Sequence, residues 1–360
     1  MPCGCWSDER SAKFERAQQL NAAAVEAPYG RAAMRAWILD ESPGSYRLGE
    51  VADPEPGPDE VRVRLVASAV NHMDLWLTKG LPKPHLPHVP GADGAGVVDL
   101  VGEGVEGVAV GDEVVINPAL SCGRCTPCRR DQSPLCRSFG ILGEHRRGTH
   151  AELVTVPARQ VVPKPAGRSW EEGAAYGLCA LTAWRMLRRA RLSAGETLLV
   201  VGVGGGVSSF GLLLGLAMGA RVVVTSRDGA KRADALAVGA AEAYDSADER
   251  WPVQADVVFE NVGAATWDRS LRALAPGGRL VTCGGTSGGT VPLSLPRLFF
   301  RQHELIGSTM GSYGEFELVT ALVVRGLPVP VDAVLGLDQL PEALSRLDEG
   351  AQLGKIVLRH

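Results

Sequence analysis

The sequence predicts an α/β protein in which a partly open β-barrel precedes a doubly wound parallel sheet. Between residues 35 and 162 the chain contains short strand patterns separated by glycine and proline turns, which is typical of small barrels. From Trp170 onward helical and strand patterns alternate, which is typical of a parallel sheet. A strand, a glycine turn, a helix and a second strand follow one another over residues 197–227, as in a βαβ unit that binds a dinucleotide.

Length and composition limit the class of protein. The chain has 360 residues, of which 45% are hydrophobic and 22% charged, and this is enough for two domains of a soluble globular protein. A net charge of -4 indicates neither nucleic acid nor an anionic membrane as a partner. There is no long apolar run and no signal-peptide pattern, so we expect a cytoplasmic protein. Eight cysteines in that compartment indicate metal ligands or free thiols rather than disulfides.

Changes of pattern divide the chain into four parts. Residues 1–32 are expected to be a flexible N-terminal extension. Residues 33–165 form the barrel domain, which ends near the junction at Pro163 to Pro165. Residues 166–309 form the parallel-sheet domain. Residues 310–360 are expected to return to the barrel domain.

The elements of both domains follow from hydrophobic periodicity. Strands of the barrel are expected over residues 34–39, 61–67, 96–101, 112–116 and 152–157. In the parallel-sheet domain we expect strands over residues 197–202, 220–225, 255–260, 278–283 and 303–308. The helices are expected over residues 171–189, with a break near Gly177, and over 209–219, 231–238, 267–274, 316–325 and 340–347. A closing strand is expected over residues 355–358.

The glycine turn is the first candidate binding element. Gly202, Gly204 and Val207 fit the pattern G-x-G-x-x-G with valine in the last place. Glycines allow the backbone to approach a pyrophosphate, and the following helix supplies N–H groups and a partial positive charge. The turn residues Gly204, Gly205, Gly206, Val207 and Ser208 are therefore cofactor-binding candidates. The alternative is a purely structural turn between two buried elements.

The end of the second strand of this unit predicts the cofactor. An NAD site favours an acidic residue there, to bind the ribose 2′-hydroxyl, but the chain has Ser226 and Arg227, with Lys231 close behind. Serine and basic side chains suit a 2′-phosphate, so we expect NADPH. The alternative for Arg227 and Lys231 is an ordinary solvated loop.

A cluster of four cysteines is the second candidate site. Cys122, Cys125, Cys128 and Cys136 have the spacing C-x2-C-x2-C-x7-C, in a loop with almost no apolar residues of its own. Four thiolates suit a tetrahedral zinc ion and leave no open position, so the site is expected to be structural. The alternatives are an iron–sulfur cluster or free thiols.

The glycine turn and the cysteine spacing together resemble the medium-chain dehydrogenase/reductase superfamily, which contains zinc alcohol dehydrogenases and quinone reductases. Further similar segments lie at residues 91–98, 111–114, 181–184, 275–279 and 354–358, so the resemblance covers about residues 34–360. It implies a GroES-like barrel that carries the substrate and a Rossmann domain that carries the nucleotide.

The resemblance also shows what this chain lacks. Zinc alcohol dehydrogenases hold a catalytic zinc through a cysteine, a histidine and a second cysteine. In this chain these positions correspond to Asn71, Ala92 and a position near Leu178, next to Cys179. We therefore expect the catalytic metal site to be empty, so that the four-cysteine site is the one metal site of the protein. A substitute ligand set of His72, Asp93 and Cys179 is the alternative.

Because the chain is expected to lack a catalytic Lewis acid, the resemblance is to the zinc-free branch of the superfamily. Members of that branch reduce activated double bonds of quinones, enones or enoyl thioesters with NADPH. The developing enolate then needs hydrogen-bond donors. Asn71 is the expected donor, His72 is a second, and Asp74 is expected to fix the local turn. The alternative for Asn71 is turn chemistry. The alternatives for the protein are a zinc alcohol dehydrogenase with unusual ligands and a non-enzymatic nucleotide-binding protein.

The resemblance implies further contacts and partners. It places Thr182 near the nicotinamide, Lys355 near the cofactor phosphates, and four residues at the ends of two strands beside the cofactor, namely Asn261, Gly263, Gly284 and Thr286. A small-molecule substrate is expected, and a homodimer or homotetramer joined near residues 290–298.

Overall fold

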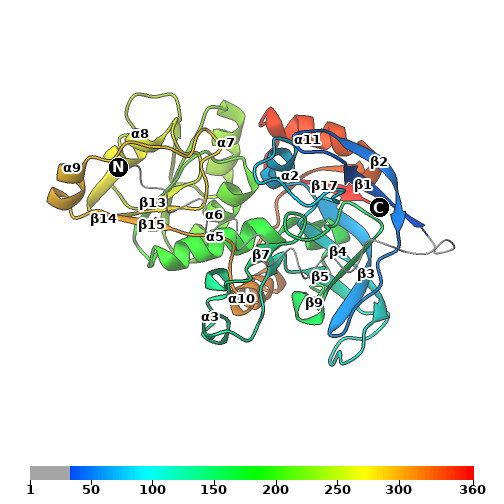
Figure 1. Cartoon of the computed structure of the whole chain (residues 1–360). Coiled ribbons are helices and arrows are strands. Elements are labelled where there is room, and N and C mark those ends of the chain that lie inside the picture. Colours follow the sequence, from blue (N-terminus) through cyan, green and yellow to red (C-terminus); the bar gives the residue numbers. More distant parts are fainter. Residues whose placement is uncertain (1–32) are drawn as a thin grey trace, which may run out of the picture. The chain divides into compact units, whose positions relative to one another are not determined.

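The computed structural model describes residues 33–360, so the predicted extension over residues 1–32 lies outside the described part (Figure 1). Two compact units are present. The first contains residues 33–177, Val334–Glu349 and Ile356–His360, and the second contains Leu178–Ala333 and Gly350–Lys355. These limits differ from the expected ones. Residues 166–177 belong to the first unit because helix α4 (Trp170–Ala175) packs on its strands, and residues 310–333 belong to the second.

The first unit contains a seven-stranded sheet with the order β16-β17-β3-β4-β5-β9, and β8 also pairs with β3. These strands are β3 (Glu60–Ala69), β4 (Asp93–Val101), β5 (Glu113–Ile116), β8 (Leu153–Pro157), β9 (Val161–Pro163), β16 (Val331–Gly336) and β17 (Lys355–Arg359). Two small antiparallel pairs accompany it, β1 (Ala33–Leu39) with β2 (Tyr46–Ala52), and β6 (Ala119–Leu120) with β7 (Gly140–Ile141). The antiparallel sheet confirms the predicted barrel domain.

The alternation of β3 decides which side chains form the core of this sheet. Val61, Val63 and Leu65 point to one side and pack with Val98 and other apolar residues, as the period of two requires. The closing strand β17, drawn in red, lies beside β3, drawn in blue, although the two come from opposite ends of the chain (Figure 1). The predicted return of the C-terminal strand to the barrel is thus observed.

Short helices complete the first unit: α2 (His72–Thr78), α3 (Thr126–Arg129), α4 and α11 (Leu340–Asp348), with 3-10 turns at Ser133–Leu135, Ala158–Gln160 and Leu337–Gln339. Helix α4 begins with a capping box in which Ser169 and Glu172 bond reciprocally. It ends before Tyr176, and α5 (Gly177–Arg189) follows at once. The predicted break near Gly177 is confirmed.

The second unit contains a six-stranded parallel sheet with the order β12-β11-β10-β13-β14-β15. The strands are β10 (Thr197–Val200), β11 (Arg221–Ser226), β12 (Glu242–Asp245), β13 (Ala255–Glu260), β14 (Leu274–Thr282) and β15 (Glu304–Gly307). Strand order reverses at β10, so the predicted doubly wound sheet is confirmed. The carboxyl ends on either side of such a reversal are where ligands bind in this architecture.

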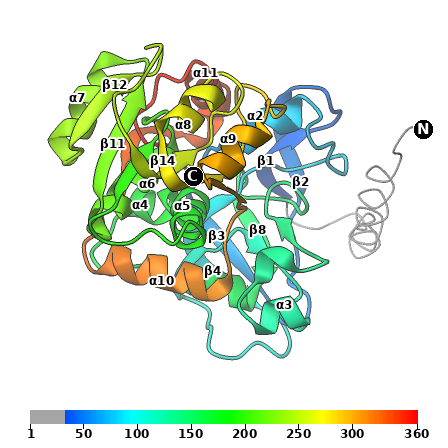
Figure 2. The same ribbon diagram turned by 90° about the vertical axis from the view of Figure 1, so that its left-hand side faces the viewer.

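Four helices connect strands of this sheet: α6 (Gly206–Ala217), α7 (Gly229–Val238), α8 (Trp267–Ala273) and α9 (Leu295–Phe300). Helix α5 precedes the first strand, and α10 (Tyr313–Val324) follows the last one. Figure 2 shows α7 beside β11 and β12 at one edge of the sheet. The prediction that α6 begins at Ser209 was wrong. Gly205 is the extended cap residue and the helix begins at Gly206, so Val207 and Ser208 belong to its first turn.

At the other edge of the sheet, β15 has a partner on one side only within the described chain. The preceding helix α9 exposes Phe299 at 59% and Phe300 at 80%, and apolar side chains so exposed are often covered by a partner. The expected oligomer contact near residues 290–298 stays a prediction. Among residues 33–360 no helix is both long and apolar enough to span a bilayer.

Candidate functional site

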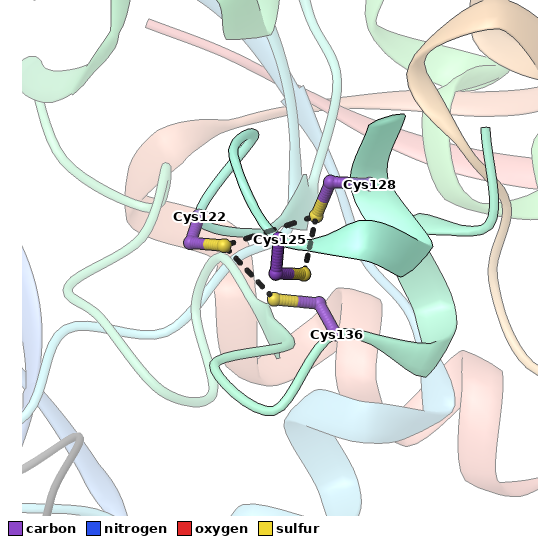
Figure 3. A group of neighbouring side chains, drawn as sticks. All are labelled: Cys122, Cys125, Cys128 and Cys136. Atoms are coloured by element: carbon purple, nitrogen blue, oxygen red, sulfur yellow. Dashed lines mark hydrogen bonds between the residues drawn. The ribbon is translucent and has the colours of Figure 1, made fainter. Parts of the chain in front are cut away.

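The four predicted cysteines come together in the first unit (Figure 3). Their sulfur atoms all lie within 4.8 Å of one another. The Sγ atoms of Cys125 and Cys128 are 3.4 Å apart, those of Cys122 and Cys136 are 3.5 Å apart, and those of Cys122 and Cys128 are 3.9 Å apart. A tetrahedral ion with metal–sulfur bonds of about 2.3 Å needs sulfur separations of about 3.8 Å. The cluster therefore fits a tetrahedral metal ion.

Local structure explains how the cysteines converge. Cys125 is the cap residue of α3, Pro127 favours its first turn, and Cys128 lies on the helix. The turn at Ser133–Leu135 then returns the chain, and Cys136 donates its backbone N–H to the Ser133 carbonyl. Sequence reasoning missed Arg159, whose guanidinium donates to the carbonyls of Ser121 and Cys122.

Hydrogen bonds also prepare one thiol for ionisation. Burial opposes the thiolate of Cys122, but backbone N–H groups of Arg124 and Cys125 outweigh it and lower the pKa to about 6. Burial raises the pKa of Cys136 to about 12. A divalent cation among the four sulfurs would hold all of them as thiolates. Among residues 33–360 this is the one group of at least three histidine, cysteine or acidic side chains close enough to share a metal ion.

A second set of predicted residues lies at the start of α2. Asn71 is the cap residue and Asp74 is the third residue of the helix. The Asp74 carboxylate accepts the backbone N–H of Asn71 at 2.8 Å and that of Gly91 at 3.2 Å. Asp74 is fully buried, so these bonds are shielded from water. The carboxylate therefore joins the loop after β3 to the loop before β4.

The Asn71 side chain bonds across these two loops. Its Nδ2 donates to Asp93 Oδ2 at 3.0 Å and to the Ala69 carbonyl at 3.3 Å. Asp93 is fully buried and Asn71 is 5% exposed. Because an ionised carboxylate accepts only, it requires the NH2 side of the amide to face it. Asn71 and Ala92, the two positions at which the resemblance would place zinc ligands, thus carry a hydrogen-bonded amide and a methyl group.

The third predicted catalytic residue has a different neighbour. His72 is the first residue of α2, and its ring centroid lies 6.3 Å from that of Trp76. His72 and Asp93 belong to the first unit, while Cys179 belongs to the second.

Sequence reasoning assigned no role to His150, whose Nε2 lies 3.4 Å from Asp74 Oδ2. Nothing local to residue 150 signals this contact.

The glycine turn of the second unit has the backbone that its sequence predicts. Gly202 has φ +73° and Gly204 has φ +124°, values that favour glycine. A Cβ on Gly204 would lie 2.7 Å from the Lys231 side chain, and one on Gly206 would lie 2.7 Å from Cys179 Sγ. Ser208, in the first turn of α6, bonds to Asn261. Because the glycines carry no side chains, the backbone N–H groups at the start of the helix are accessible, and this suits a phosphate.

Two buried lysines lie against this turn. Lys231 is 9% exposed and Lys355 is 2% exposed. The Nζ of Lys231 donates to the Gly350 carbonyl at 2.5 Å, and the Nζ of Lys355 lies 3.7 Å from Cys179 Sγ. Burial lowers the pKa of Lys231, and the negative charges of Asp228 and Asp332 partly offset this decrease. Two ammonium groups beside a glycine turn give this region an anion-binding character.

The remaining strand-end residues divide into two groups. Ser226 accepts the Asp228 N–H at 3.2 Å, and Arg227 is exposed. Thr182 donates to Met310 Sδ at 3.7 Å. The two predicted loops after β13 and β14 lie together, because the Thr286 N–H donates to the Asn261 carbonyl at 3.5 Å.

Glycine at position 263 allows the close packing of these loops. Gly263 has φ +90°, and a Cβ there would lie 2.5 Å from the Gly288 carbonyl. Gly284 is the second residue after β14, and its carbonyl accepts a bond from the Thr282 hydroxyl. Sequence reasoning missed Glu260, a fully buried carboxylate that accepts the N–H groups of Val262 and Gly263 at 2.6 and 3.0 Å. Such a carboxylate fixes the turn that follows β13.

Comparisons with known proteins agree with this architecture. Residues 57–166 match the model of the alcohol dehydrogenase GroES-like domain, and residues 206–325 match that of the zinc-binding dehydrogenase. The chain is 32% identical to acryloyl-coenzyme A reductase of Metallosphaera sedula, over 90% of this chain and 99% of that one. It is 34% identical to a zinc-type alcohol dehydrogenase-like protein of Schizosaccharomyces pombe, over 91% and 99%.

Solved structures give the same result. A crystal structure described as an NAD-dependent alcohol dehydrogenase superposes with a TM-score of 0.86 at 42% identity, covering 91% of this chain and all of that one. The 2-octenoyl-CoA carboxylase reductase CinF, in complex with NADP and 2-octenoyl-CoA, superposes with a TM-score of 0.85 at 27% identity, covering 93% and 89%. Both alcohol dehydrogenases and enoyl-thioester reductases are therefore among its structural neighbours.

Proposed function

Because the chain belongs to the medium-chain dehydrogenase/reductase superfamily of zinc-type alcohol dehydrogenase-like proteins, we propose that it is an NADPH-dependent reductase of carbon–carbon double bonds conjugated to a carbonyl or thioester. The observation that supports this proposal is the Asn71–Asp93 bond beside Ala92. An amide and a methyl group are poor zinc ligands, so alcohol oxidation would lose its Lewis acid. The acryloyl- and octenoyl-thioester enzymes among its relatives support the substrate class.

The residues of this chain would stabilise the negative charge that forms on the substrate oxygen. A bound NADPH would supply a hydride to the β-carbon of the substrate, and a proton from water would complete the reduction at the α-carbon. One Asn71 N–H is held by Asp93 at 3.0 Å, whereas the bond to Ala69 is longer, at 3.3 Å. We therefore assign the second N–H to the substrate oxygen, since the weaker bond is the more easily exchanged. His72 is a second donor in this proposal, and Asp74 holds the Asn71 backbone.

The second unit would hold the cofactor. We assign its pyrophosphate to the backbone N–H groups of Gly205 to Ser208 at the start of α6. We assign the 2′-phosphate to Ser226, Arg227 and Lys231, because no acidic residue ends β11. The NADP complex of CinF supports this choice. The NAD-dependent neighbour is the reason that both cofactors must be compared.

We further propose that the four-cysteine cluster holds one structural zinc ion. Three of the sulfur separations, at 3.4 to 3.9 Å, lie near the tetrahedral value and support zinc, and four protein ligands leave no place for a substrate. The cluster therefore stabilises the loop over residues 121–139 rather than taking part in the reaction.

The proposed reaction is tested with a panel of substrates. NADPH oxidation should be rapid with at least one of crotonyl-CoA, a cyclic enone and a benzoquinone. Oxidation of primary and secondary alcohols with NADP+ or NAD+ should be slower by a large factor. The reverse preference would identify a zinc alcohol dehydrogenase with unusual ligands. NADPH binding with no turnover on any substrate would identify a nucleotide-binding protein without this activity.

The Asn71 side chain should matter to the rate. Asn71→Ala removes one donor to the enolate, and we expect a loss of about 1–3 kcal/mol of transition-state stabilisation, seen as about a 5- to 150-fold lower kcat/KM. The matched control is Asn117→Ala, because Asn117 is also buried and its amide oxygen accepts the Ala119 N–H. An Asn71→Ala enzyme with the kcat/KM of the control would remove Asn71 from the mechanism.

A further inference from the structure

A buried chain of polar side chains runs from Asp74 to His360. The Asp74 Oδ2 atom lies 3.4 Å from His150 Nε2, and His150 Nδ1 lies 3.1 Å from Ser68 Oγ. Ser68 Oγ in turn lies 2.9 Å from His360 Nε2. Asp74, His150 and Ser68 are each fully buried. All four residues belong to the first unit, and they come from four separate segments of the chain.

The donors and acceptors of this chain are consistent with one another. Asp74 as a carboxylate accepts only, so His150 must donate from Nε2. A neutral His150 then accepts at Nδ1, which requires Ser68 to donate its hydroxyl proton there. Ser68 is left as the acceptor for His360 Nε2. Burial and the nearby His150 lower the pKa of His360 to about 3, so His360 is neutral at pH 7 and can make this bond with its N–H.

The inner end of the chain acts on the proposed donor Asn71. Asp74 accepts the backbone N–H groups of Asn71 and Gly91 at 2.8 and 3.2 Å. The Asn71 side chain is bonded to Asp93, the first residue of the strand β4 that follows Gly91. The orientation of the Asp74 carboxylate therefore sets the spacing of both loops, and His150 Nε2 contacts the same oxygen, Oδ2, that accepts the Asn71 N–H.

Close packing holds the His150 ring in place. A Cβ on Gly91 would lie 2.7 Å from the His150 backbone nitrogen and 2.8 Å from its Nδ1 atom. The His150 backbone is bonded on both sides, because its N–H donates to Pro90 at 2.9 Å and its carbonyl accepts from Trp37 at 2.9 Å. The ring therefore has little freedom to leave Asp74.

We propose that His150 is a positioning residue, which orients Asp74 and thereby the Asn71 amide, and that Ser68 and His360 fix the tautomer of His150 for this task. This proposal rests on the proposed function of Asn71. His150 touches neither substrate nor cofactor in it. The hydrogen bond from Nε2, and not the bulk of the imidazole, is what the reaction needs.

Two variants of His150 separate the hydrogen bond from the packing. In His150→Gln the amide nitrogen reaches the place of Nε2 and keeps the donor to Asp74. In His150→Asn the amide nitrogen reaches only the place of Nδ1. We expect kcat to fall about 10- to 100-fold in His150→Asn, as for a misplaced catalytic group, with an unchanged Kd for NADPH. His150→Gln should recover most of this loss, and Ser68→Ala should show an intermediate one.

The control for a buried histidine is His303→Gln in the second unit, because the Nε2 of His303 is buried and has no hydrogen-bond partner among the described residues. The kcat of this variant should equal that of the wild type. Equal losses of kcat in His150→Asn and His150→Gln would overturn the proposal, because packing alone would then explain both. A wild-type kcat in His150→Asn would overturn it as well.

A second readout does not depend on activity. The amide protons of Asn71 and Gly91 are bonded to Asp74, so their hydrogen exchange should be at least about 10-fold faster in His150→Asn than in His150→Gln, as expected for the loss of about 1.4 kcal/mol of protection. Unchanged exchange at both amides would overturn the positioning of Asp74. Faster exchange in a protein that reduces no enone would instead show that the proposed reaction, and not the positioning, is wrong.

Discussion

Removal of the metal from the four-cysteine cluster should unfold the loop over residues 121–139 and destabilise the first unit. The loop buries little apolar surface of its own. Leu135 is 62% exposed, and Cys136, at 7%, is the one buried cysteine of the cluster. Structural zinc sites have apparent binding free energies of about 10–16 kcal/mol near neutral pH. We therefore expect this to be the largest single effect on stability in the protein.

The measurement combines metal content with hydrogen exchange. The purified protein should contain one zinc per chain, and a strong chelator or Cys125→Ser should abolish it and remove exchange protection from residues 121–139. The second unit should keep its protection from hydrogen exchange, because the cluster lies wholly within the first unit. The matched control is Cys283→Ser, a half-buried thiol outside the cluster, which should keep its zinc. A Cys125→Ser protein that still binds one zinc would contradict a four-ligand site.

Lys231→Met should weaken NADPH binding far more than NADH binding. The Lys231 ammonium group is 9% exposed and donates to one carbonyl, that of Gly350. It lies over the glycine turn, where a Cβ on Gly204 would reach 3.1 Å from its Nζ. A hydrogen bond to a charged group contributes about 1.5–3 kcal/mol. We therefore expect the Kd for NADPH to rise about 10- to 150-fold.

NADH provides the internal control for this variant. Loss of the bond to Gly350 should change the Kd of both cofactors equally, because both are assigned to the same glycine turn. The ratio of the change in Kd for NADPH to that for NADH therefore reports the contact with the 2′-phosphate alone. Lys231→Arg keeps the charge and should retain part of the preference. An equal loss for NADPH and NADH would show that Lys231 only holds the Gly350 segment. Wild-type protein that binds NADH as tightly as NADPH would contradict the cofactor assignment itself.

Several local features could be read from the sequence because short-range chemistry produces them. The break between α4 and α5 follows from the chain around Gly177, and the turn that Asp74 was expected to fix is the one in which it accepts the Asn71 N–H. The predicted start of α6 is three residues too late, because glycines are typical of turns. Gly206 begins the helix nevertheless, since Gly205 supplies the extended cap.

Other features could not be read because their partners are distant in the chain. The domain limit near residue 177 depends on α4 packing against β3 and β4. The short strands β12 and β16 have no hydrophobic alternation of their own and exist through pairing with their neighbours. Glu260 gives no local signal that its buried carboxylate will fix the turn at Gly263.

By itself the sequence determined the two-domain α/β class, the glycine turn and the cysteine cluster. Each of these depends on residues close together in the chain, whose spacing alone fixes turn, helix start or ligand geometry. The tertiary structure alone decided that Asn71 bonds to Asp93, and that His150, Ser68 and His360 meet behind Asp74. Buried polar groups must find partners wherever the fold brings them, and no spacing along the chain records which partner that will be.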